Sequence, residues 1–258
     1  MTTMSRALTV PAHYSGPGGT ADGGWVAGTV ACHLPMGATV EVTLSAPVPV
    51  GRALRVERAA GDDGSQHVRL YAEGGGDVLA EAREVDERPL PPPFVPPEEA
   101  EQAGRAFPGR GGHPTPGCFV CGHRPPGEGL RVRPGPTGWP DEYAALWRVP
   151  PELAEWSATL PLSHVWGALG CPTGCAHLGA GGYAVLGRLT ARVRGSVFTG
   201  APYVVVARQE ARRGGRLYAG AALYETGGAL VAASRAVWVE ETPSSWTGAG
   251  SRGTPPSR

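Results

Sequence analysis

The Asp-Gly-Gly tripeptide at residues 22–24 places a carboxylate and two glycines directly before an apolar run. Val26, Val30 and Leu34 recur at helical spacing, which predicts a helix over 22–34 with Asp22 as its N-cap. A helix N-terminus offers unpaired amides and a partial positive charge to a carbonyl that becomes an oxyanion. Glycine lets the carbonyl come close, and the carboxylate could orient or deprotonate a water. The same residues also fit a plain helix cap with glycines that permit tight packing.

A second polar pair, Ser163 and His164, lies near the start of the apolar run 160–178, LPLSHVWGALGCPTGCAHL. Histidine titrates near neutral pH, so His164 could act as a base or as a hydrogen-bond donor. A histidine on such a helix is equally compatible with a packing role. Several tryptophans could line an apolar pocket or belong to an ordinary core: Trp25, Trp147, Trp156, Trp166 and Trp238.

Four of the five cysteines form two pairs, Cys118-x-x-Cys121 and Cys171-x-x-x-Cys175. Thiolates at this spacing could hold a structural zinc ion if the two segments meet, with three histidines close by in sequence, His113, His123 and His177. Nothing in the sequence brings the segments together, so packing thiols without a metal are the expectation. A disulfide framework is not expected from so few cysteines.

Several function classes are disfavoured by composition and motifs. The chain has 23 basic and 23 acidic residues, which gives no electrostatic reason to expect a nucleic acid or an anionic membrane as partner. It contains no Gly-rich phosphate loop after a strand, no G-x-S-x-G elbow and no H-E-x-x-H motif. No apolar run approaches the roughly 18 residues of a membrane span, and the N-terminus lacks the apolar core of a secretory signal. We therefore expect a cytoplasmic protein.

All basic residues are arginine, and lysine, asparagine and isoleucine are absent. These three amino acids share A/T-rich codons, which indicates a high-GC genome, and we infer a bacterial one.

The run 160–178 predicts a second helix, behind Pro161 and with Leu162, Val165, Trp166 and Leu169 on one face. Pro172 should end or kink it, because proline lacks the amide and clashes with the preceding turn. Four strand-like runs follow each predicted helix, and such short apolar helices need a sheet to pack against. Strands are expected at 40–46, 52–58, 67–73, 78–85, 142–149, 183–194, 203–209, 216–224 and 229–239.

The chain therefore reads as two modules, 1–87 and 118–242. They are joined by a Pro-rich connector at 88–117, in which no packed element is expected, and a disordered tail follows at 243–258. The modules also resemble each other, because LYAEGGGDVLAEAREV at 70–85 aligns with LYETGGALVAASRAVW at 223–238. Duplication explains this likeness, although Gly- and Ala-rich hairpins could also match by chance.

Three stretches, in this order, resemble the double hotdog fold of the acyl-CoA thioesterase and dehydratase superfamily: ADGGWVAG at 21–28, CFVCGHRPPGEGL at 118–130 and VWGALGCPTG at 165–174. The resemblance implies an α+β tandem hotdog, in which each half is a helix wrapped by a curved antiparallel sheet. It further implies an acyl-CoA or acyl-carrier-protein thioester as substrate, bound between the halves, and no metal or redox cofactor.

In that reading Asp22 positions the water, the Gly24 amide helps to hold the oxyanion and His164 is a supporting polar group. The residues expected around the substrate are Gly23, Trp25, Ser163 and Trp166. Related hydrolases carry an acidic residue immediately before the Cys-Pro pair, where this chain has Gly170.

Two alternatives therefore stay open: a binder of acyl thioesters that has lost hydrolysis, and a hydratase or dehydratase that uses His164 or His33 with an acidic partner. Two fused modules could function as a monomer or assemble further.

Overall fold

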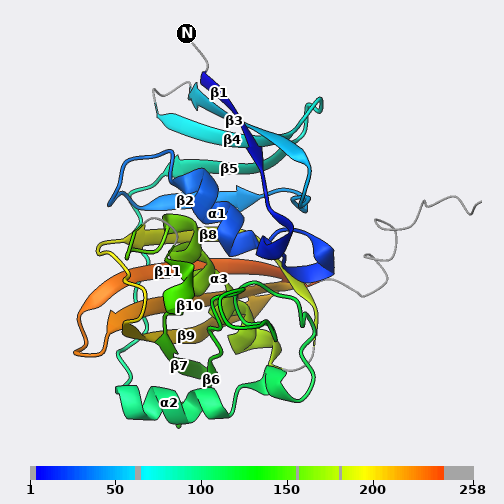
Figure 1. Cartoon of the computed structure of the whole chain (residues 1–258). Coiled ribbons are helices and arrows are strands. Elements are labelled where there is room, and N and C mark those ends of the chain that lie inside the picture. The colour runs from blue at the N-terminus through cyan, green and yellow to red at the C-terminus, as the bar shows by residue number, and fades with distance from the viewer. Residues whose placement is uncertain (1–3, 62–64, 155–156, 180–181, 241–258) are drawn as a thin grey trace, which may run out of the picture.

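A computed structural model describes residues 4–61, 65–154, 157–179 and 182–240. In these residues eleven strands form one antiparallel sheet in the order β1-β3-β4-β5-β2-β8-β11-β10-β9-β7-β6 (Figure 1). The strands are β1 Met4–Thr9, β2 Val40–Leu44, β3 Ala53–Ala60, β4 Gln66–Ala72, β5 Val78–Glu84, β6 Gly135–Pro136, β7 Glu142–Arg148, β8 Ala184–Val193, β9 Pro202–Arg213, β10 Arg216–Glu225 and β11 Leu230–Glu240.

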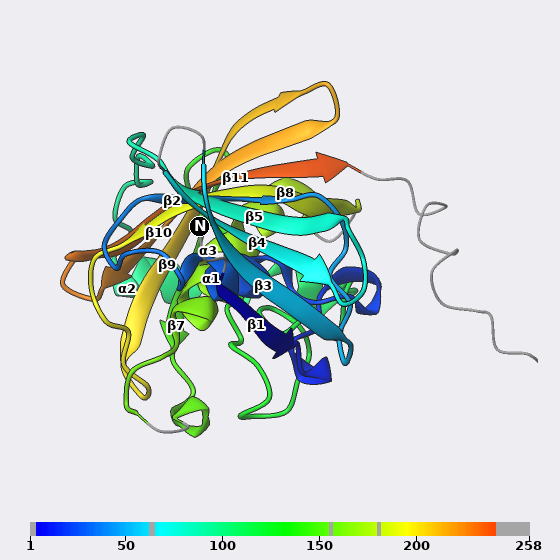
Figure 2. The ribbon, with the colours of Figure 1, turned by 90° about the horizontal axis from the view of Figure 1, so that it is seen from above.

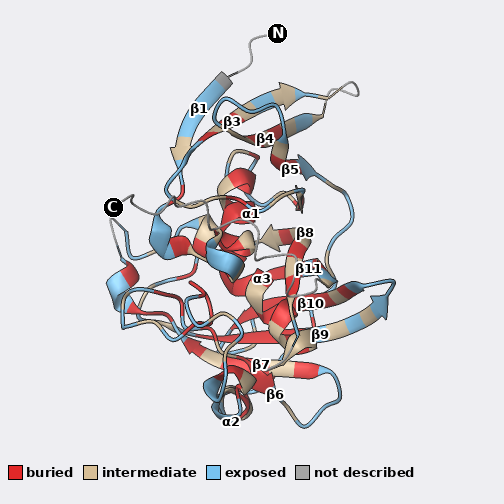
Figure 3. Cartoon of the chain, turned by 90° about the vertical axis from the view of Figure 1, so that its right-hand side faces the viewer, coloured by how far each residue is buried: buried red, intermediate tan, exposed pale blue. Residues whose placement is uncertain are grey.

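Two helices, α1 (Gly23–Ala31) and α3 (Leu162–Leu178), lie on the inner face of this sheet. Seen from above, the sheet curls around both helices (Figure 2). Both helices are largely buried, as the red segments of Figure 3 show. The predicted arrangement, a helix wrapped by a curved antiparallel sheet in each half, is confirmed. No helix among the described residues is both long and apolar enough to span a membrane.

The two halves share one continuous sheet. Strand β2 of the first half pairs with β8 of the second, from Val40 opposite Ala191 to Thr43 opposite Arg188. Each half contributes a helix followed by four strands, and the two final hairpins carry a register shift at aligned positions, Leu70/Tyr71 and Leu223/Tyr224. A shared irregularity of this kind supports duplication over chance likeness.

Helices α1 and α3 cross in direct contact, and glycines make this possible. A Cβ atom on Gly28 would lie 2.6 Å from the Cα of Ser163, and one on Gly24 would lie 2.9 Å from the Cα of Gly167. Both contacts are with backbone atoms, which have little freedom to move away. Gly24 and Gly28 therefore serve the helix crossing.

The second helix does not end at Pro172, so that part of the prediction is wrong. Pro161 is the N-cap, and α3 continues through Pro172 to Leu178. The turn after Pro172 is held by the sheet, because the indole of Trp238 on β11 donates to Thr173 Oγ1 at 2.8 Å and packs against Gly174. This packing compensates for the hydrogen bond that proline removes.

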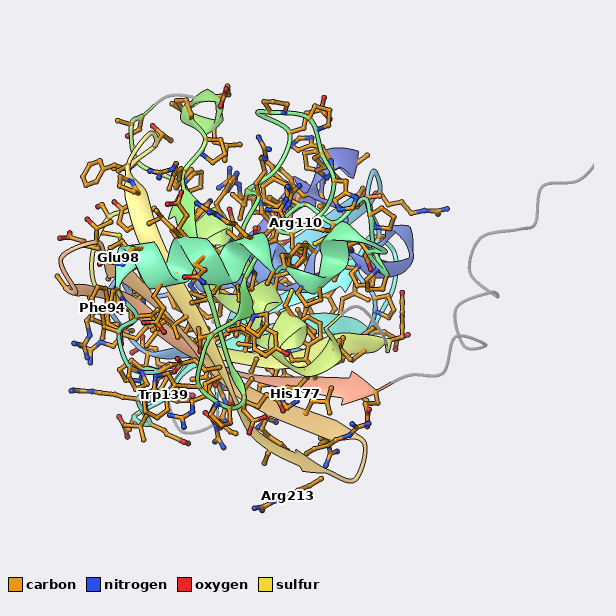
Figure 4. The ribbon with its side chains drawn as sticks, turned by 90° about the horizontal axis from the view of Figure 1, so that it is seen from below. Phe94, Glu98, Arg110, Trp139, His177 and Arg213 are labelled. Carbon is orange, nitrogen blue, oxygen red and sulfur yellow. The ribbon has the colours of Figure 1, made fainter. Side chains whose placement is uncertain are left out.

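The prediction that the connector 88–117 holds no packed element is also wrong. It contains α2, Pro97–Arg105, whose Pro97 occupies a first-turn position and whose Glu98 and Glu99 favour the helix N-terminus. Ala100 and Ala103 of α2 are buried in a small second core with strand residues Ala144, Val204, Val206, Ala222 and Tyr224. Figure 4 shows α2, with Glu98, lying across the lower part of the molecule. Strands β1 and β6 were not predicted either, and the tail at 243–258 lies outside the described residues.

Candidate functional site

Asp22 is the buried N-cap of α1, with 5% of its surface exposed. Its Oδ1 accepts a hydrogen bond from the Trp25 amide at 2.9 Å. Burial, and secondarily the nearby Cys118 thiol, raise the pKa of Asp22 well above its usual value, against the lowering effect of the amides. The capping role that the sequence left open is therefore present.

The first two residues of α1, Gly23 and Gly24, have different surroundings. Gly24 is packed against Trp166 and Gly167 of α3. Gly23 precedes it as the first helical residue, and the first amides of a helix have no intrahelical acceptor. Gly23 is thus a second candidate for an oxyanion donor, and the expected role of Gly24 stays a prediction.

A cavity of about 250 Å³ opens at the seam between the halves. It lies where β2 and β8 separate beyond Thr43 and Arg188, next to the N-terminus of α1. Its lining is mainly apolar and includes Asp22, Gly23, Val26, Leu44, Ala46, Val48, Val185, Leu186 and Trp238. The structure therefore brings the carboxylate and the first amide of α1 to an apolar inter-repeat cavity.

His164 does not reach this cavity. It is buried in an aromatic cluster, edge-on to Tyr14 and Phe119 with ring centroids 5.5 and 5.2 Å away. Burial, with a smaller contribution from His13, lowers the pKa of His164 to about 4. Its Nδ1 lies 3.3 Å from Ser163 Oγ. A neutral histidine among aromatic rings matches the packing role that the sequence left open.

The tryptophans predicted to contact substrate lie in different places. Trp25 stacks on Tyr14 at a centroid distance of 4.3 Å and is buried, and its indole Nε1 has no hydrogen-bond partner among the residues that the structure describes. Trp166 lines another cavity, of about 350 Å³, with Leu162 and the ends of α1 and β8. Trp147 belongs to the core, where its indole donates to Leu130 O at 2.7 Å. Trp238 lines the Asp22 cavity, and Trp156 lies outside the described residues.

The two cysteine segments do meet. The sulfur atoms of Cys118, Cys121 and Cys171 all lie within 4.8 Å of one another, and those of Cys121 and Cys171 are 3.1 Å apart. Cys118 Sγ lies 3.8 Å from Asp22 Oδ2. A small cavity of about 70 Å³ borders this cluster, and Asp22, Pro17 and Trp238 line both it and the larger cavity. The CxxC and CxxxC spacings were the available signal, but only the fold shows that they converge.

The hydratase pair considered from the sequence is not assembled among the described residues. His33 is half-buried just past α1, where burial and the arginines Arg58 and Arg6 lower its pKa. The imidazole of His164 has Ser163 Oγ as its hydrogen-bond partner, and no hydrogen bond joins either histidine ring to a carboxylate within the described residues.

Comparisons with known proteins identify solved structures that share this fold. No protein-family model and no curated protein matches the chain significantly. Among solved structures, the chain is similar to the TesB protein of Mycobacterium avium subspecies paratuberculosis, with a TM-score of 0.60, 15% identity and coverage of 92% of this chain and 93% of that one. A hot dog fold protein of unknown function from Alicyclobacillus acidocaldarius matches with a TM-score of 0.53, 15% identity and coverage of 93% and 94%. The dehydratase domain of PpsC from Mycobacterium tuberculosis, in complex with C12:1-CoA, matches with a TM-score of 0.57, 16% identity and coverage of 93% and 94%. The chain thus has the double hotdog fold, and likeness at these identities concerns the fold alone.

Proposed function

We propose that this double hotdog protein hydrolyses an acyl thioester, carried by coenzyme A or by an acyl carrier protein, in the cavity between its two halves. One observation carries the proposal: Asp22 and Gly23, at the N-terminus of α1, line an apolar cavity at the seam. Solved structures of this fold that are named as thioesterases, a putative thioesterase II from Thermobifida fusca and the acyl-CoA thioesterase II TesB2 from Mycobacterium marinum, support the choice of substrate class.

The acyl chain would lie along the apolar lining formed by residues such as Val26, Leu44 and Leu186. The carbonyl oxygen would accept a hydrogen bond from the Gly23 amide, where the partial positive charge of the helix N-terminus stabilises a developing oxyanion. Asp22 would accept a hydrogen bond from the attacking water and so orient it toward the carbonyl carbon. As the C–O bond forms, a proton of the water would pass to Asp22; collapse of the tetrahedral intermediate breaks the C–S bond, and the leaving thiolate takes up that proton. Water and thioester thus become a carboxylic acid and a free thiol.

A second function, binding of an acyl thioester without turnover, is favoured by a different observation. Asp22 already accepts from the Trp25 amide on Oδ1 and lies beside the Cys118 thiol on Oδ2. Position 170 supplies no second carboxylate, because it is a glycine. A side chain there would also be crowded, since its Cβ would lie 3.2 Å from Leu189 Cδ2 and 3.3 Å from the Gly24 Cα. A carboxylate that only caps the helix would leave a ligand pocket without a group to activate water.

A panel of acyl-CoA and acyl-carrier-protein thioesters, assayed by release of free thiol, tests the proposal. Asp22→Asn is the informative variant, since asparagine caps a helix about as well as aspartate but lacks the carboxylate. We expect its kcat to fall by about 100-fold, the lower end of a catalytic acid–base contribution. Asp77→Asn, in the exposed β4–β5 turn, is the matched control.

Two results would decide against hydrolysis. Full activity in Asp22→Asn would remove Asp22 from the mechanism. Calorimetric binding of an acyl-CoA without thiol release across the panel would establish the binding function in its place.

A further inference from the structure

We propose that Cys118, Cys121, Cys171 and Cys175 bind one Zn²⁺ ion as a tetrathiolate site. The first three sulfur atoms lie within 4.8 Å of one another, and Cys175 follows Cys171 by one turn on α3. All four residues line one small cavity. Four thiolates in tetrahedral arrangement are a standard structural site for zinc, and both pairs have the short ligand spacing typical of such sites.

The loop that carries the first pair has the shape of a ligand turn. The Val120 amide points at Cys118 Sγ from 3.4 Å, and the Gly122 amide donates to the Cys118 carbonyl at 3.0 Å. A Cβ on Gly122 would lie 2.4 Å from that carbonyl oxygen, so the tight turn requires glycine. The second pair lies four residues apart on α3, so both thiols project from the same side of the helix. Each pair is thus held by its own backbone before any ion binds.

Groups outside the four sulfurs support negative charge on them. His113 Nδ1 accepts the Thr115 amide at 2.9 Å, so Nε2 carries the proton and donates to Cys121 Sγ at 3.1 Å. Arg133 donates from Nη2 to the Gly122 carbonyl at 2.5 Å and from Nε to the Cys121 carbonyl at 3.3 Å. Partners of this kind orient metal ligands and tune the site. His113 is therefore a donor to a ligand and not a ligand itself.

Simple packing does not account for this arrangement. Buried cysteines that act as small apolar residues have no reason to converge from two segments on one point, whereas the fifth cysteine, Cys32, lies exposed and apart. All four are free thiols in the structure. Binding converts four thiols and Zn²⁺ to a doubly negative complex and releases four protons. The ion would fasten the 118–133 loop to α3, beside the cap of α1.

Metal analysis of the full chain, purified without chelator, tests the site. We expect one zinc ion per chain by mass spectrometry, released as a thiol-specific mercurial is titrated into the parent protein. In Cys171→Ser the zinc content should fall at least tenfold, while Cys32→Ser, the matched control, should keep the full amount. Replacement of zinc by Co²⁺ should produce the visible absorption of tetrahedral cobalt thiolate.

Each other outcome overturns the proposal. A metal-free protein with four reactive buried thiols would show packing cysteines. An intact mass lower by two or four hydrogens, without metal, would show one or two disulfides. Iron with inorganic sulfide would show a cluster in place of zinc. The mercurial titration uses the parent protein, so the test stands even if Cys171→Ser fails to fold.

Discussion

Replacing Gly28 with alanine separates two physical effects of opposite sign at the helix crossing. On helix propensity alone, Gly28→Ala should stabilise α1 by about 1 kcal/mol. At this position, however, the new methyl group would lie 2.6 Å from the Ser163 Cα and 2.7 Å from the Trp166 Cβ. These atoms belong to a packed helix, so α1 and α3 must move apart or the core must distort.

The magnitude follows from these two terms. Overpacking a core costs about 1–3 kcal/mol, and contact with backbone favours the upper end of that range. After subtraction of the propensity gain, we expect the free energy of unfolding to fall by about 2 kcal/mol, which for a chain of this size lowers the melting temperature by about 4–8 °C.

Urea titration followed by far-ultraviolet circular dichroism measures this change. The control is Gly76→Ala in the β4–β5 turn, where a Cβ meets no atom within 4 Å, and its effect should stay within about 0.5 kcal/mol. If Gly28→Ala were as stable as the parent, or more stable, the helices would not be in the contact described. The glycines of α1 would then require another explanation, such as access of a carbonyl to the backbone.

Three further predictions concern the surroundings of the site. The pKa of His164 is lower in the folded chain, about 4, than in the unfolded chain, so protonation favours unfolding and stability should fall by about 3 kcal/mol between pH 6.5 and 4. Urea titrations across this range should show a smaller loss in His164→Gln, and an equal loss would place the titrating group elsewhere. Trp238→Phe removes the indole that donates a hydrogen bond to Thr173 Oγ1, and we expect the free energy of unfolding to fall by about 1–3 kcal/mol in the same urea titration. An unchanged urea midpoint would mean that the turn after Pro172 does not depend on the sheet. Ala100→Glu puts a charge into the contact between α2 and the sheet and should lower the melting temperature by at least about 4 °C. Gln102→Glu, on the exposed face of the same helix, should leave the melting temperature unchanged. Equal effects of the two variants would refute the packing of α2 on the sheet.

The features that could be predicted from sequence were those with a strong local cause. Alternation of apolar residues located β2 and its neighbours, and Asp22 at the start of an apolar run located the N-terminus of α1. The features that were missed depend on contacts distant in sequence. Helix α2 has a favourable first turn, but the prolines around it mask the two alanines that pack on the sheet. Continuation of α3 through Pro172 depends on Trp238, 66 residues further along the chain.

In the candidate site, too, the features with a local cause could be predicted from the sequence and those that depend on distant contacts could not. The capping role of Asp22 is local and was foreseen as one of two possibilities. That Gly23 lines the cavity while Gly24 lies in the helix crossing is seen only in the coordinates of the cap and of the crossing. The cysteine pairs were visible as spacings, but Cys121 and Cys171 lie 50 residues apart and only the packing of the loop on α3 brings their sulfurs to 3.1 Å. His164 could not be assigned from its type, because burial among aromatic rings decides its protonation.

The two halves of the chain place different groups at their cavities, although their folds correspond. The cavity at the N-terminus of α1 lies where β2 ends and β8 begins, and the cavity at the N-terminus of α3 lies where β8 ends and β2 begins. These two positions correspond under the duplication. Only the first has a carboxylate at the helix cap, because α3 is preceded by Pro161, which offers no side-chain cap. The second cavity is lined instead by Trp166, Arg194 and apolar residues, and position 170 of its helix is a glycine held against Gly24. Any chemistry that needs a carboxylate beside a helix N-terminus therefore belongs to the first cavity, and the second half contributes its strands β8 and β11 as walls of that cavity.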